Sequence, residues 1–439
     1  MKEIRTTRSV SFLLIALLLI FFSCGALAQK KASKKTTGSK AEIIDGKVVN
    51  DKELNESSGT VLDLSGTELN DLNSIKRIRT KNELILSETP IKDFKELDDF
   101  KQYISFDLSN TAIDNLEPFQ KLKNVQTLNL SKTKITKVDD LKGLRKLVNL
   151  NLDQTEIFDI TVFDSLDRLT VLSMNETKVD KIEALKNCRS LSEIYLRKTS
   201  VFDISAIGKL SKLLILDLNE TPITKIDALN TVLHLRELDI SKTFVFDIKH
   251  LRNLRKLSIL NASGTQISDI SSLITHVQMQ ELYLKGTPIK QVDALRKMIY
   301  LKTLDLSSTL TEDISPLAHL KSLEELNLMD VKATNIESLK KLTNLKTLNL
   351  AGLKIKRVDS LQYLKSLQSL DISRTDVTDL KPLEKLKSLK TVYLVGSKIP
   401  EEKLSELKKK KLGFKIATEY PEPKDSDSES DKKKKKKTK

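Results

Sequence analysis

The residues that commonly carry catalytic or metal chemistry are few and scattered in this sequence. Its four histidines and two cysteines share no spacing that is typical of a metal site. The chain also has no glycine-rich phosphate loop and no G-x-S-x-G nucleophile motif. Cys188 stands where equivalent segments carry leucine, so we interpret it as a buried apolar residue. We therefore expect a protein that is not an enzyme and needs no metal or cofactor.

A threonine recurs every 22 residues and sets the organisation of the chain. Similar stretches read LNLSKTKITKVDDL at 128–141 and LDLNETPITKIDAL at 216–229. Val331, Leu353 and Ser397 take the place of the threonine in the other units, and no insertion interrupts the step. The recurring threonines are Thr67, Thr89, Thr111, Thr133, Thr155, Thr177, Thr199, Thr221, Thr243, Thr265, Thr287, Thr309 and Thr375.

Each 22-residue unit predicts one strand and one short helical turn. Apolar residues five and three positions before the threonine alternate with outward residues, as in a strand with one buried face. Apolar residues two, five, eight and eleven positions after it have a spacing of three, which favours a tight helical turn. The position four after it is often an aspartate that is well placed to cap that turn: Asp159, Asp203, Asp247, Asp313 and Asp379.

The pattern L-x-L-x-x-T-x-I-x-x-I-x-x-L-x-x-L resembles the leucine-rich repeat of the 22-residue, internalin-like type over residues 59–399. The resemblance implies an α/β solenoid, a horseshoe or arc of about sixteen coils with a parallel concave sheet and short helical or 3-10 convex segments. The family usually has asparagine where this chain has threonine. We expect each threonine hydroxyl to donate to one coil and accept from the next, forming a ladder. At Val331 and Leu353 the ladder should be interrupted. Either the chain bends locally there, or an apolar side chain simply replaces the threonine.

The two ends of the chain differ from the repeats. Residues 1–28 are predicted to be a signal peptide of a bacterial exported protein, with a basic start and an apolar run at 10–22. Two interpretations of its processing stay open. The signal peptide is cleaved after ALA at 26–28, or residues 21–24 are a lipobox in which Cys24 is acylated. Residues 29–41 read as a basic disordered tether and 42–58 as an N-terminal cap. Residues 400–417 read as a C-terminal cap of helix and strand, and 418–439 as a disordered charged tail.

Charge separates the outward strand positions from the rest of the chain. The 439-residue chain carries a net charge of +15. The positions six, four and two residues before the threonine should line the concave surface, yet they hold twelve acids and only two bases, Arg197 and Lys285. Apolar residues interrupt this field, and exposed aromatics in a polar surface are typical binding anchors. The candidate partner-binding residues are Val171, Glu193, Tyr195, Arg197, Ile215, Asp217, Glu237, Asp239, Ile259, Glu281, Tyr283 and Lys285.

These features predict an exported binding scaffold, either lipid-anchored in the cell envelope or secreted. Its partner is expected to be a protein, and a basic one because the concave face is acidic, with a glycan as the alternative ligand. A structural envelope protein held by basic tails is a second reading, and a phosphatase-type regulatory subunit is a third. The membrane could be reached through acylated Cys24 or through the lysine tail, which suits anionic surfaces. We expect no nucleic acid, because the tail lacks aromatic residues for base stacking.

Overall fold

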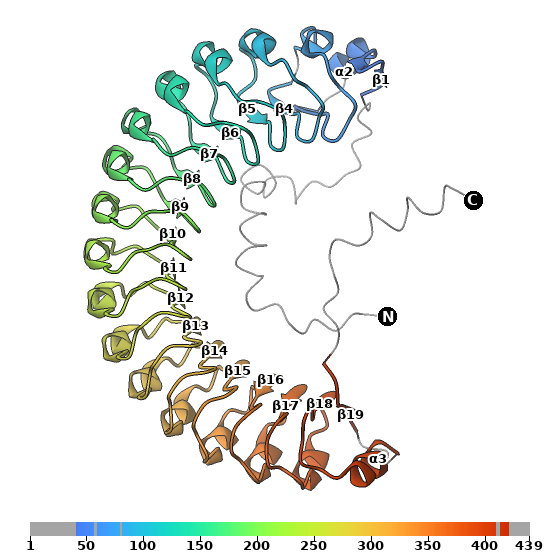
Figure 1. The fold of residues 1–439 in the computed structure, drawn as a ribbon, viewed down its shortest axis with the longest axis vertical. Coiled ribbons are helices and arrows are strands. Elements are labelled where there is room, and N and C mark those ends of the chain that lie inside the picture. The colour runs from blue at the N-terminus through green and yellow to red at the C-terminus, as the bar shows by residue number, and fades with distance from the viewer. Residues whose placement is uncertain (1–40, 57–58, 80, 410–412, 421–439) are drawn as a thin grey trace. The chain divides into compact units, whose positions relative to one another are not determined.

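The computed structural model describes residues 41–56, 59–79, 81–409 and 413–420 (Figure 1). These residues form two compact units that divide between Leu235 and Arg236, and each unit is described by itself. The predicted signal peptide, the lipobox at Cys24, the tether up to residue 40 and the tail from residue 421 lie outside the described residues.

Unit 1 is a run of parallel strands that follows a small N-terminal hairpin. Strands β1 (Ile43–Ile44) and β2 (Lys47–Val48) pair antiparallel, and helix α2 (Asp51–Glu56) follows them. Eight three-residue strands then pair in sequence order with a register of 22 residues, so that Leu62 faces Leu84. They are β3 (Val61–Asp63), β4 (Glu83–Ile85), β5 (Ser105–Asp107), β6 (Thr127–Asn129), β7 (Asn149–Asn151), β8 (Val171–Ser173), β9 (Glu193–Tyr195) and β10 (Ile215–Asp217).

Unit 2 repeats this arrangement and ends in a short helix and a last strand. Its strands also pair in parallel and in sequence order. Helix α3 (Glu401–Lys409) lies between the last two of them. The strands are β11 (Glu237–Asp239), β12 (Ile259–Asn261), β13 (Glu281–Tyr283), β14 (Thr303–Asp305), β15 (Glu325–Asn327), β16 (Thr347–Asn349), β17 (Ser369–Asp371), β18 (Thr391–Tyr393) and β19 (Lys415–Ala417).

A 3-10 helix follows each strand from β3 to β17, as the spacing of three predicts. The aspartate cap is confirmed: the Thr161 N–H donates to Asp159 Oδ1 at 2.8 Å, and the Lys249 N–H donates to Asp247 Oδ1 at 2.8 Å. In unit 1 the helices are η1 (Leu72–Ile75), η2 (Lys95–Asp99), η3 (Glu117–Lys121), η4 (Asp139–Gly143), η5 (Thr161–Ser165), η6 (Glu183–Asn187), η7 (Ser205–Lys209) and η8 (Asp227–Thr231). In unit 2 they are η9 (Lys249–Asn253), η10 (Ser271–Thr275), η11 (Asp293–Lys297), η12 (Ser315–His319), η13 (Glu337–Lys341), η14 (Asp359–Tyr363) and η15 (Lys381–Lys385).

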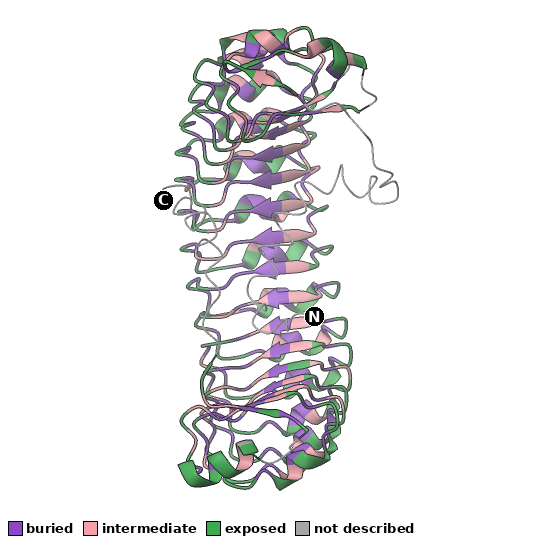
Figure 2. Cartoon of the chain, turned by 90° about the vertical axis from the view of Figure 1, so that its right-hand side faces the viewer, coloured by how far each residue is buried: buried purple, intermediate pink, exposed green. Residues whose placement is uncertain are grey.

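The core of each unit is a stack of apolar columns between the strands and the 3-10 helices. In the coil of Thr221, Leu218, Ile223 and Leu229 are fully buried, and each such side chain contributes about 1.5–3 kcal/mol. A single coil cannot bury these residues alone, because their contacts come from the coils on either side. Figure 2 shows buried residues along the strands and exposed residues on the loops. Parallel strands, 3-10 turns and buried columns together confirm the leucine-rich repeat solenoid.

The recurring threonine hydrogen-bonds within its own coil, so the expected ladder between coils is wrong. Thr133 Oγ1 donates to the Leu130 carbonyl at 2.6 Å, and Thr221 Oγ1 donates to the Leu218 carbonyl at 2.6 Å. The same bond recurs at Thr155, Thr177, Thr199, Thr243, Thr265 and Thr287. The chain turns sharply between the threonine and the carbonyl three residues back, which brings that carbonyl within hydrogen-bonding distance of the hydroxyl.

That turn needs a left-handed residue immediately before the threonine. Lys132, Glu220 and Lys242 have φ of 58°, 56° and 55°, although none of them is glycine. Such a conformation costs a non-glycine residue about 1–2 kcal/mol, so it persists only where the surroundings fix it. At Val331 the preceding residue keeps a φ of 56° and the backbone N–H still donates to the Leu328 carbonyl at 3.2 Å. The turn therefore survives there without its hydroxyl, and Val331 is an apolar replacement.

We expect Thr221→Val to lower the free energy of unfolding by about 1 kcal/mol, because the hydroxyl bond to the Leu218 carbonyl is lost. The reverse change, Val331→Thr, should raise it by up to about 1 kcal/mol, because the Leu328 carbonyl gains a donor. Urea midpoints followed by circular dichroism would measure both changes. Shifts in the same direction for the two variants would contradict this account of the turn.

One histidine lies in the core of unit 2 in place of a leucine. His276 is fully buried, its Nδ1 lies 3.3 Å from the Leu273 carbonyl, and its Nε2 has no hydrogen-bond partner. Burial lowers the pKa of His276 below its ordinary value, because the charged ring would lose its hydration. The native state therefore holds a neutral ring at a pH where the unfolded chain is already protonated.

This burial predicts an acid sensitivity that a single substitution removes. The stability contributed by neutral His276 is present above the unfolded-state pKa of about 6.5 and is lost as the pH falls below it. We expect His276→Leu to weaken the loss of thermal stability between pH 7 and pH 5. Met298→Leu, at the same position of the next coil, controls for repacking. An unchanged pH profile for His276→Leu would show that His276 is not the group responsible.

Candidate binding face

The outward side chains of the strands form the candidate site, which we call the concave face. In each unit the strands line the inner side and the 3-10 helices lie on the outer side (Figure 1). In unit 1, register places Val171 and Ile215 on either side of Glu193. The unit 1 face therefore carries a carboxylate between two aliphatic side chains, all three of them half-buried.

Unit 2 shows the same alternation of acid and apolar side chains. Register places Ile259 between Glu237 and Glu281, and Tyr283 lies beside Asp305 on the next strand. Ile259, Glu281 and Tyr283 are half-buried, which leaves part of each side chain open to a ligand. The predicted residues are thus brought together within each unit as neighbouring positions of one sheet.

Tyr195 does not project from the face, which corrects the expectation that both tyrosines are exposed anchors. Tyr195 is 1% exposed and its hydroxyl donates to Glu193 Oε2 at 2.9 Å. Tyr283 donates to Glu281 Oε2 at 2.7 Å. Each hydroxyl therefore reaches the residue two positions earlier on its own strand, so the ring lies back along the strand. Tyr195 cannot anchor a partner while it is buried, whereas Tyr283 retains an accessible part.

Aspartates of the concave face cap the turn that follows each strand, a role that the sequence interpretation missed. Asp217 Oδ1 accepts the Asn219 N–H at 2.8 Å, and Asp239 Oδ1 accepts the Ser241 N–H at 2.8 Å. Both aspartates are buried, at 5% and 7% exposure. Asparagine takes the same role elsewhere, as where Asn151 Oδ1 accepts the Asp153 N–H at 2.8 Å. These carboxylates are structural, so the acidity available to a partner is smaller than the sequence count implies.

The Asp and Asn side chains four residues before the threonine also form the hydrogen bonds between coils that we had expected from threonine. Asn261 Nδ2 donates to Asp239 Oδ2 at 2.9 Å, and Asn327 Nδ2 donates to Asp305 Oδ2 at 3.2 Å. In the sequence, the signal for this role is the frequent occurrence of Asp or Asn four residues before the threonine. A short amide or carboxylate oxygen suits both bonds, because it reaches its own backbone and the neighbouring coil.

The glutamates six residues before the threonine are the better candidates for binding. Within the described residues, no lysine or arginine lies within 4.0 Å of Glu281 or Glu325. The pKa of Glu325 is raised, first by partial loss of hydration against the sheet and then by the charges of Glu281 and Glu324, and the charge of Lys346 offsets part of this rise. In unit 1, burial and then Asp107 and Asp63 raise the pKa of Glu83. Carboxylates that repel each other favour a cationic ligand that relieves the repulsion.

The two predicted bases of the face differ in environment. Arg197 is half-buried, its backbone N–H donates to Asn175 Oδ1 at 2.8 Å, and its Nε has no hydrogen-bond partner. Lys285 is exposed. Lys285 is therefore the more accessible of the two bases.

The described residues show exposed phenylalanines that the sequence interpretation did not single out. Phe158 and Phe202 in unit 1 are 58% and 59% exposed, three residues after the recurring threonine. Phe246 holds the same position in unit 2. Their signal was the 44-residue recurrence of the dipeptide Phe-Asp, in which the aspartate caps the 3-10 helix and the phenylalanine points outward.

No arrangement suited to catalysis stands out among the described residues. They contain no group of three or more His, Cys, Asp or Glu side chains that could hold a metal ion. Cys188 is buried, its Sγ donates to the Phe163 carbonyl at 3.1 Å, and burial raises the pKa of its thiol to about 12. Such a thiol is protonated at neutral pH and is a weak nucleophile. In the same part of the chain, no helix has the length and apolar character needed to span a bilayer.

Comparison with known proteins supports the fold. No protein-family model matches the sequence, and no curated protein matches it significantly. Among solved structures, an internalin of Listeria monocytogenes matches with a TM-score of 0.61 and 22% identity, over 84% of this chain and 92% of that one. A leucine-rich repeat protein of Leptospira interrogans matches with a TM-score of 0.76 and 22% identity, over 82% and 95%. The functional domain of InlJ from Listeria monocytogenes gives 0.60 and 18%, over 73% and 75%.

The InlJ domain is described as including a cysteine ladder, whereas the described part of this chain has a single cysteine, Cys188. Its recurring polar residues are instead threonine and Asp or Asn, each bonded to the turn as shown above. The geometry and the solved structures agree on the architecture: this chain has a leucine-rich repeat fold of the kind found in bacterial internalin-type proteins.

Substitution of one capping aspartate tests the structural role of its column. Asp305→Asn should keep nearly full stability, because an amide oxygen can still accept the Ser307 N–H, which is now 2.8 Å from Asp305 Oδ1. Asp305→Ala should lower the free energy of unfolding by about 1 kcal/mol, since that N–H and the Asn327 amide both lose their acceptor. Urea denaturation would compare the two. Equal losses would mean that the charge of Asp305, and not its acceptor oxygen, stabilises the coil.

Proposed function

We propose that this chain is a non-enzymatic, exported binding scaffold that recognises a basic protein through its concave face. Proteins that share its repeat architecture include internalin-type proteins and the plant receptor RGFR1, whose structure was solved with the peptide hormone RGF2. Those similarities support a binding role by analogy of fold. The choice of face and of partner chemistry comes from the residues of this chain.

The observation that carries the proposal is a set of carboxylates without a cation on the unit 2 face. Among the described residues, none of Glu281, Asp305, Glu325 and Asp371 has a Lys or Arg within 4.0 Å. Asp305 and Asp371 are already bonded to backbone N–H groups, so Glu281 and Glu325 remain the most available. Facing lysines or arginines would gain charge-assisted hydrogen bonds and would also speed encounter.

Apolar side chains between these carboxylates give the face a second source of affinity. Ile259 and Tyr283 are half-buried next to Glu281. Removing their remaining surface from water contributes about 25 cal/mol per Å². A partner that combines basic and apolar side chains therefore fits this face better than a purely cationic one.

Export and anchoring complete the proposal and rest on the N-terminal sequence. A signal peptide at 1–28 would place the repeats in the envelope or outside the cell, and acylation of Cys24 would tether them to a membrane. The main alternative is a structural envelope protein held by its basic tails. A glycan ligand and a phosphatase-type regulatory role are further alternatives, and export weighs against the last of these.

Partner capture with a matched charge control tests the proposal. The full chain would be cross-linked to envelope and host extracts, captured proteins identified by mass spectrometry, and their affinities measured. Glu281→Gln with Glu325→Gln should weaken binding of a genuine partner at least about tenfold, because two charge-assisted contacts are lost. Glu312→Gln with Glu337→Gln removes the same charge from exposed positions off the face and should change binding less than about twofold.

Equal effects of the two double variants would remove the concave face of unit 2 from the proposal. Deleting residues 421–439 distinguishes a binding scaffold from the main alternative, a structural envelope protein held by its basic tails. A binding scaffold keeps its partner without the tail, whereas a protein held by its tail loses its envelope association.

A further inference from the structure

A strongly basic surface runs along one side of unit 2, opposite in sign to the concave face. We call this surface the basic edge. It is made up of the residues twelve, thirteen and fifteen positions after the recurring threonine, or after its replacement, in the seven coils from Thr243 to Thr375. These positions lead from each 3-10 helix into the next strand. Position fifteen supplies Lys302, Lys346 and Lys390, and the other two positions supply Arg255, Lys256, Lys321, Lys365 and Lys387. All eight are exposed, and Glu324 is the one carboxylate among these positions.

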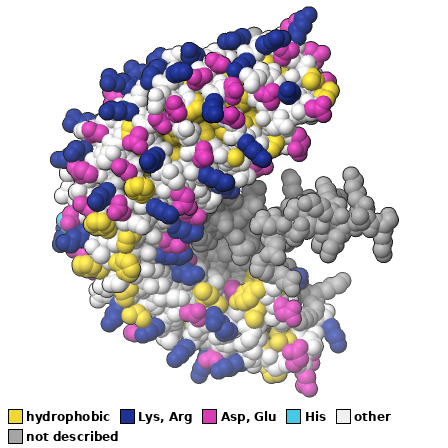
Figure 3. Space-filling model, turned by 45° about the horizontal axis from the view of Figure 1, so that its top comes forward, with side chains coloured by type: hydrophobic (Ala, Val, Ile, Leu, Met, Phe, Trp, Pro, Cys, Tyr) yellow, Lys and Arg dark blue, Asp and Glu magenta, His cyan; other side chains and the backbone are white. Residues whose placement is uncertain are grey.

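The opposite side of the same coils has no such bias. In these seven coils the opposite side carries ten carboxylates and nine Lys or Arg side chains. These are counted at the position before the recurring residue and at the positions one, three, four and six after it. On the face visible in Figure 3, basic and acidic side chains are interspersed, with hydrophobic groups between them. The basic edge is therefore a specific feature of one side and not a consequence of the net charge alone.

Backbone hydrogen bonds fix the spacing of the lysines along the edge. The Glu324 N–H donates to the Lys302 carbonyl at 2.8 Å, and the Lys346 N–H donates to the Glu324 carbonyl at 2.7 Å. Gln368 and Lys390 continue the series with bonds of 2.8 Å. Because adjacent coils lie one strand spacing apart, lysines on alternate coils recur roughly every 10 Å along the edge.

Few of these charges are neutralised. Lys346 pairs with Glu324 at 2.5 Å, and Lys390 Nζ donates to the neutral amide oxygen of Gln368 at 3.0 Å. No carboxylate of the described residues lies within 4.0 Å of Lys302, Lys321, Lys365 or Lys387. The edge thus presents four lysines, Lys302, Lys321, Lys365 and Lys387, whose charge no carboxylate of the described residues neutralises.

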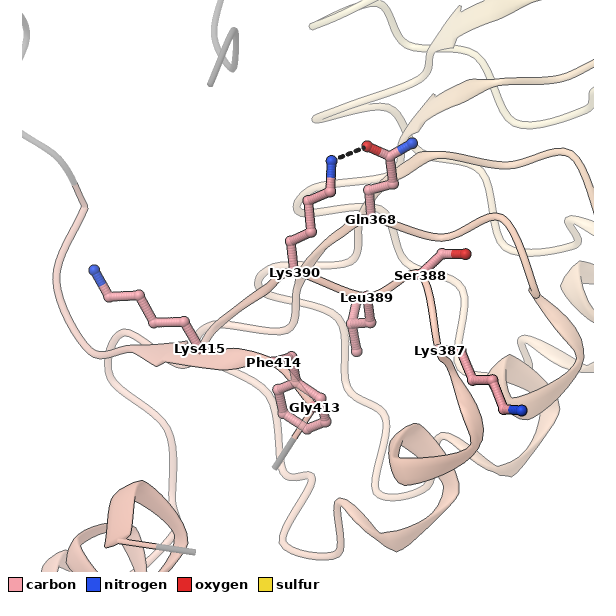
Figure 4. Close-up of a pocket in the computed structure, with 8 residues that line it drawn as sticks. All are labelled: Gln368, Lys387, Ser388, Leu389, Lys390, Gly413, Phe414 and Lys415. Atoms are coloured by element: carbon pink, nitrogen blue, oxygen red, sulfur yellow. Dashed lines mark hydrogen bonds between the residues drawn. The ribbon is translucent and has the colours of Figure 1, made fainter. Parts of the chain in front are cut away.

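The row ends in a hollow of about 610 Å³ beside β19 (Figure 4). Its described lining includes Lys387, Lys390 and Lys415 but no carboxylate. The Lys415 N–H donates to the Lys390 carbonyl at 2.8 Å, so the last strand extends the same row. In Figure 4 the three lysine side chains point in different directions, and they do not converge on one point. This arrangement suits a chain of separated charges better than one compact anion.

Hydroxyl groups beside the lysines favour a sugar polymer over a nucleic acid. The dipeptide Lys-Ser occurs at 321–322, 365–366 and 387–388, so a hydroxyl accompanies a cation in three coils. Among these positions, Tyr300 is the exposed aromatic residue, whereas single-stranded nucleic acids are held by successive aromatic platforms. Serine and lysine together can bond the hydroxyls and the acidic groups of a sugar chain.

We propose that the basic edge of unit 2 binds an extended anionic polysaccharide, whose acidic groups pair with Lys302, Lys346 and Lys390. Screening by salt would weaken this binding, because the cations are exposed. The edge shares no residue with the concave face, although its position fifteen directly precedes the strand. The proposal stands whether or not a basic protein binds the concave face.

Two triple variants of the full chain test this proposal with heparin and polygalacturonate as probes. Lys302→Gln, Lys346→Gln and Lys390→Gln should together weaken binding at least about tenfold near physiological salt, since clustered lysines contribute additively at an anionic surface. Lys290→Gln, Lys332→Gln and Lys354→Gln remove the same charge from the opposite side and should weaken it less than about twofold. Circular dichroism would verify that both variants are folded.

Three outcomes would overturn the proposal. One is no measurable binding of either polysaccharide to the unmodified chain, and another is an equal loss in the two triple variants. The third is that a thymidine oligonucleotide binds more tightly than either polysaccharide and also loses affinity when Lys302, Lys346 and Lys390 are replaced. That result would assign the surface to nucleic acid. Retained protein capture with lost glycan binding would show that the two surfaces act independently.

Discussion

The turn that ends every strand is the constraint on which the rest of the structure depends. One residue adopts a left-handed conformation, and where the next is threonine it donates its hydroxyl to the carbonyl three residues back. Where the strand carries Asp or Asn four residues before that position, its side-chain oxygen accepts the N–H two residues on. These bonds fix where the strand stops and where the chain re-enters the core. Because the step is always 22 residues, each coil within a unit repeats the same geometry.

A fixed coil also fixes what each column of side chains can do. Buried columns hold Leu, Ile and Val, the column of Asp and Asn ties the strand to its turn, and the glutamate column reaches solvent. Acidic residues on the concave face therefore serve two purposes. Asp217 and Asp239 stabilise the coil, whereas Glu281 and Glu325 have no Lys or Arg of the described residues within 4.0 Å and are available to a ligand. The basic edge adds a surface of opposite charge on the same coils of unit 2.

Period and apolar spacing were enough to predict the strands, the 3-10 helices and the aspartate caps, because these depend on local chemistry repeated many times. The bonding of the threonine was predicted wrongly. The hydroxyl bonds the carbonyl three residues back because the residue before the threonine is left-handed. A lysine or glutamate at that position, such as Lys132 or Glu220, does not indicate a left-handed conformation in the sequence. The burial of Tyr195 was also missed, since a hydroxyl that reaches Glu193 along the same strand depends on a rotamer. Columns could be assigned from the sequence, but the direction of each side chain within a column could not.

Zero-length coupling of carboxylates to amines in the complex with a captured partner tests the central claim most directly. The account predicts that partner lysines are joined to Glu281 and Glu325 on the unit 2 concave face, and that the buried Asp239 is not modified. Links confined to carboxylates of the 3-10 helices or loops would contradict it, because they would place the partner away from the strands.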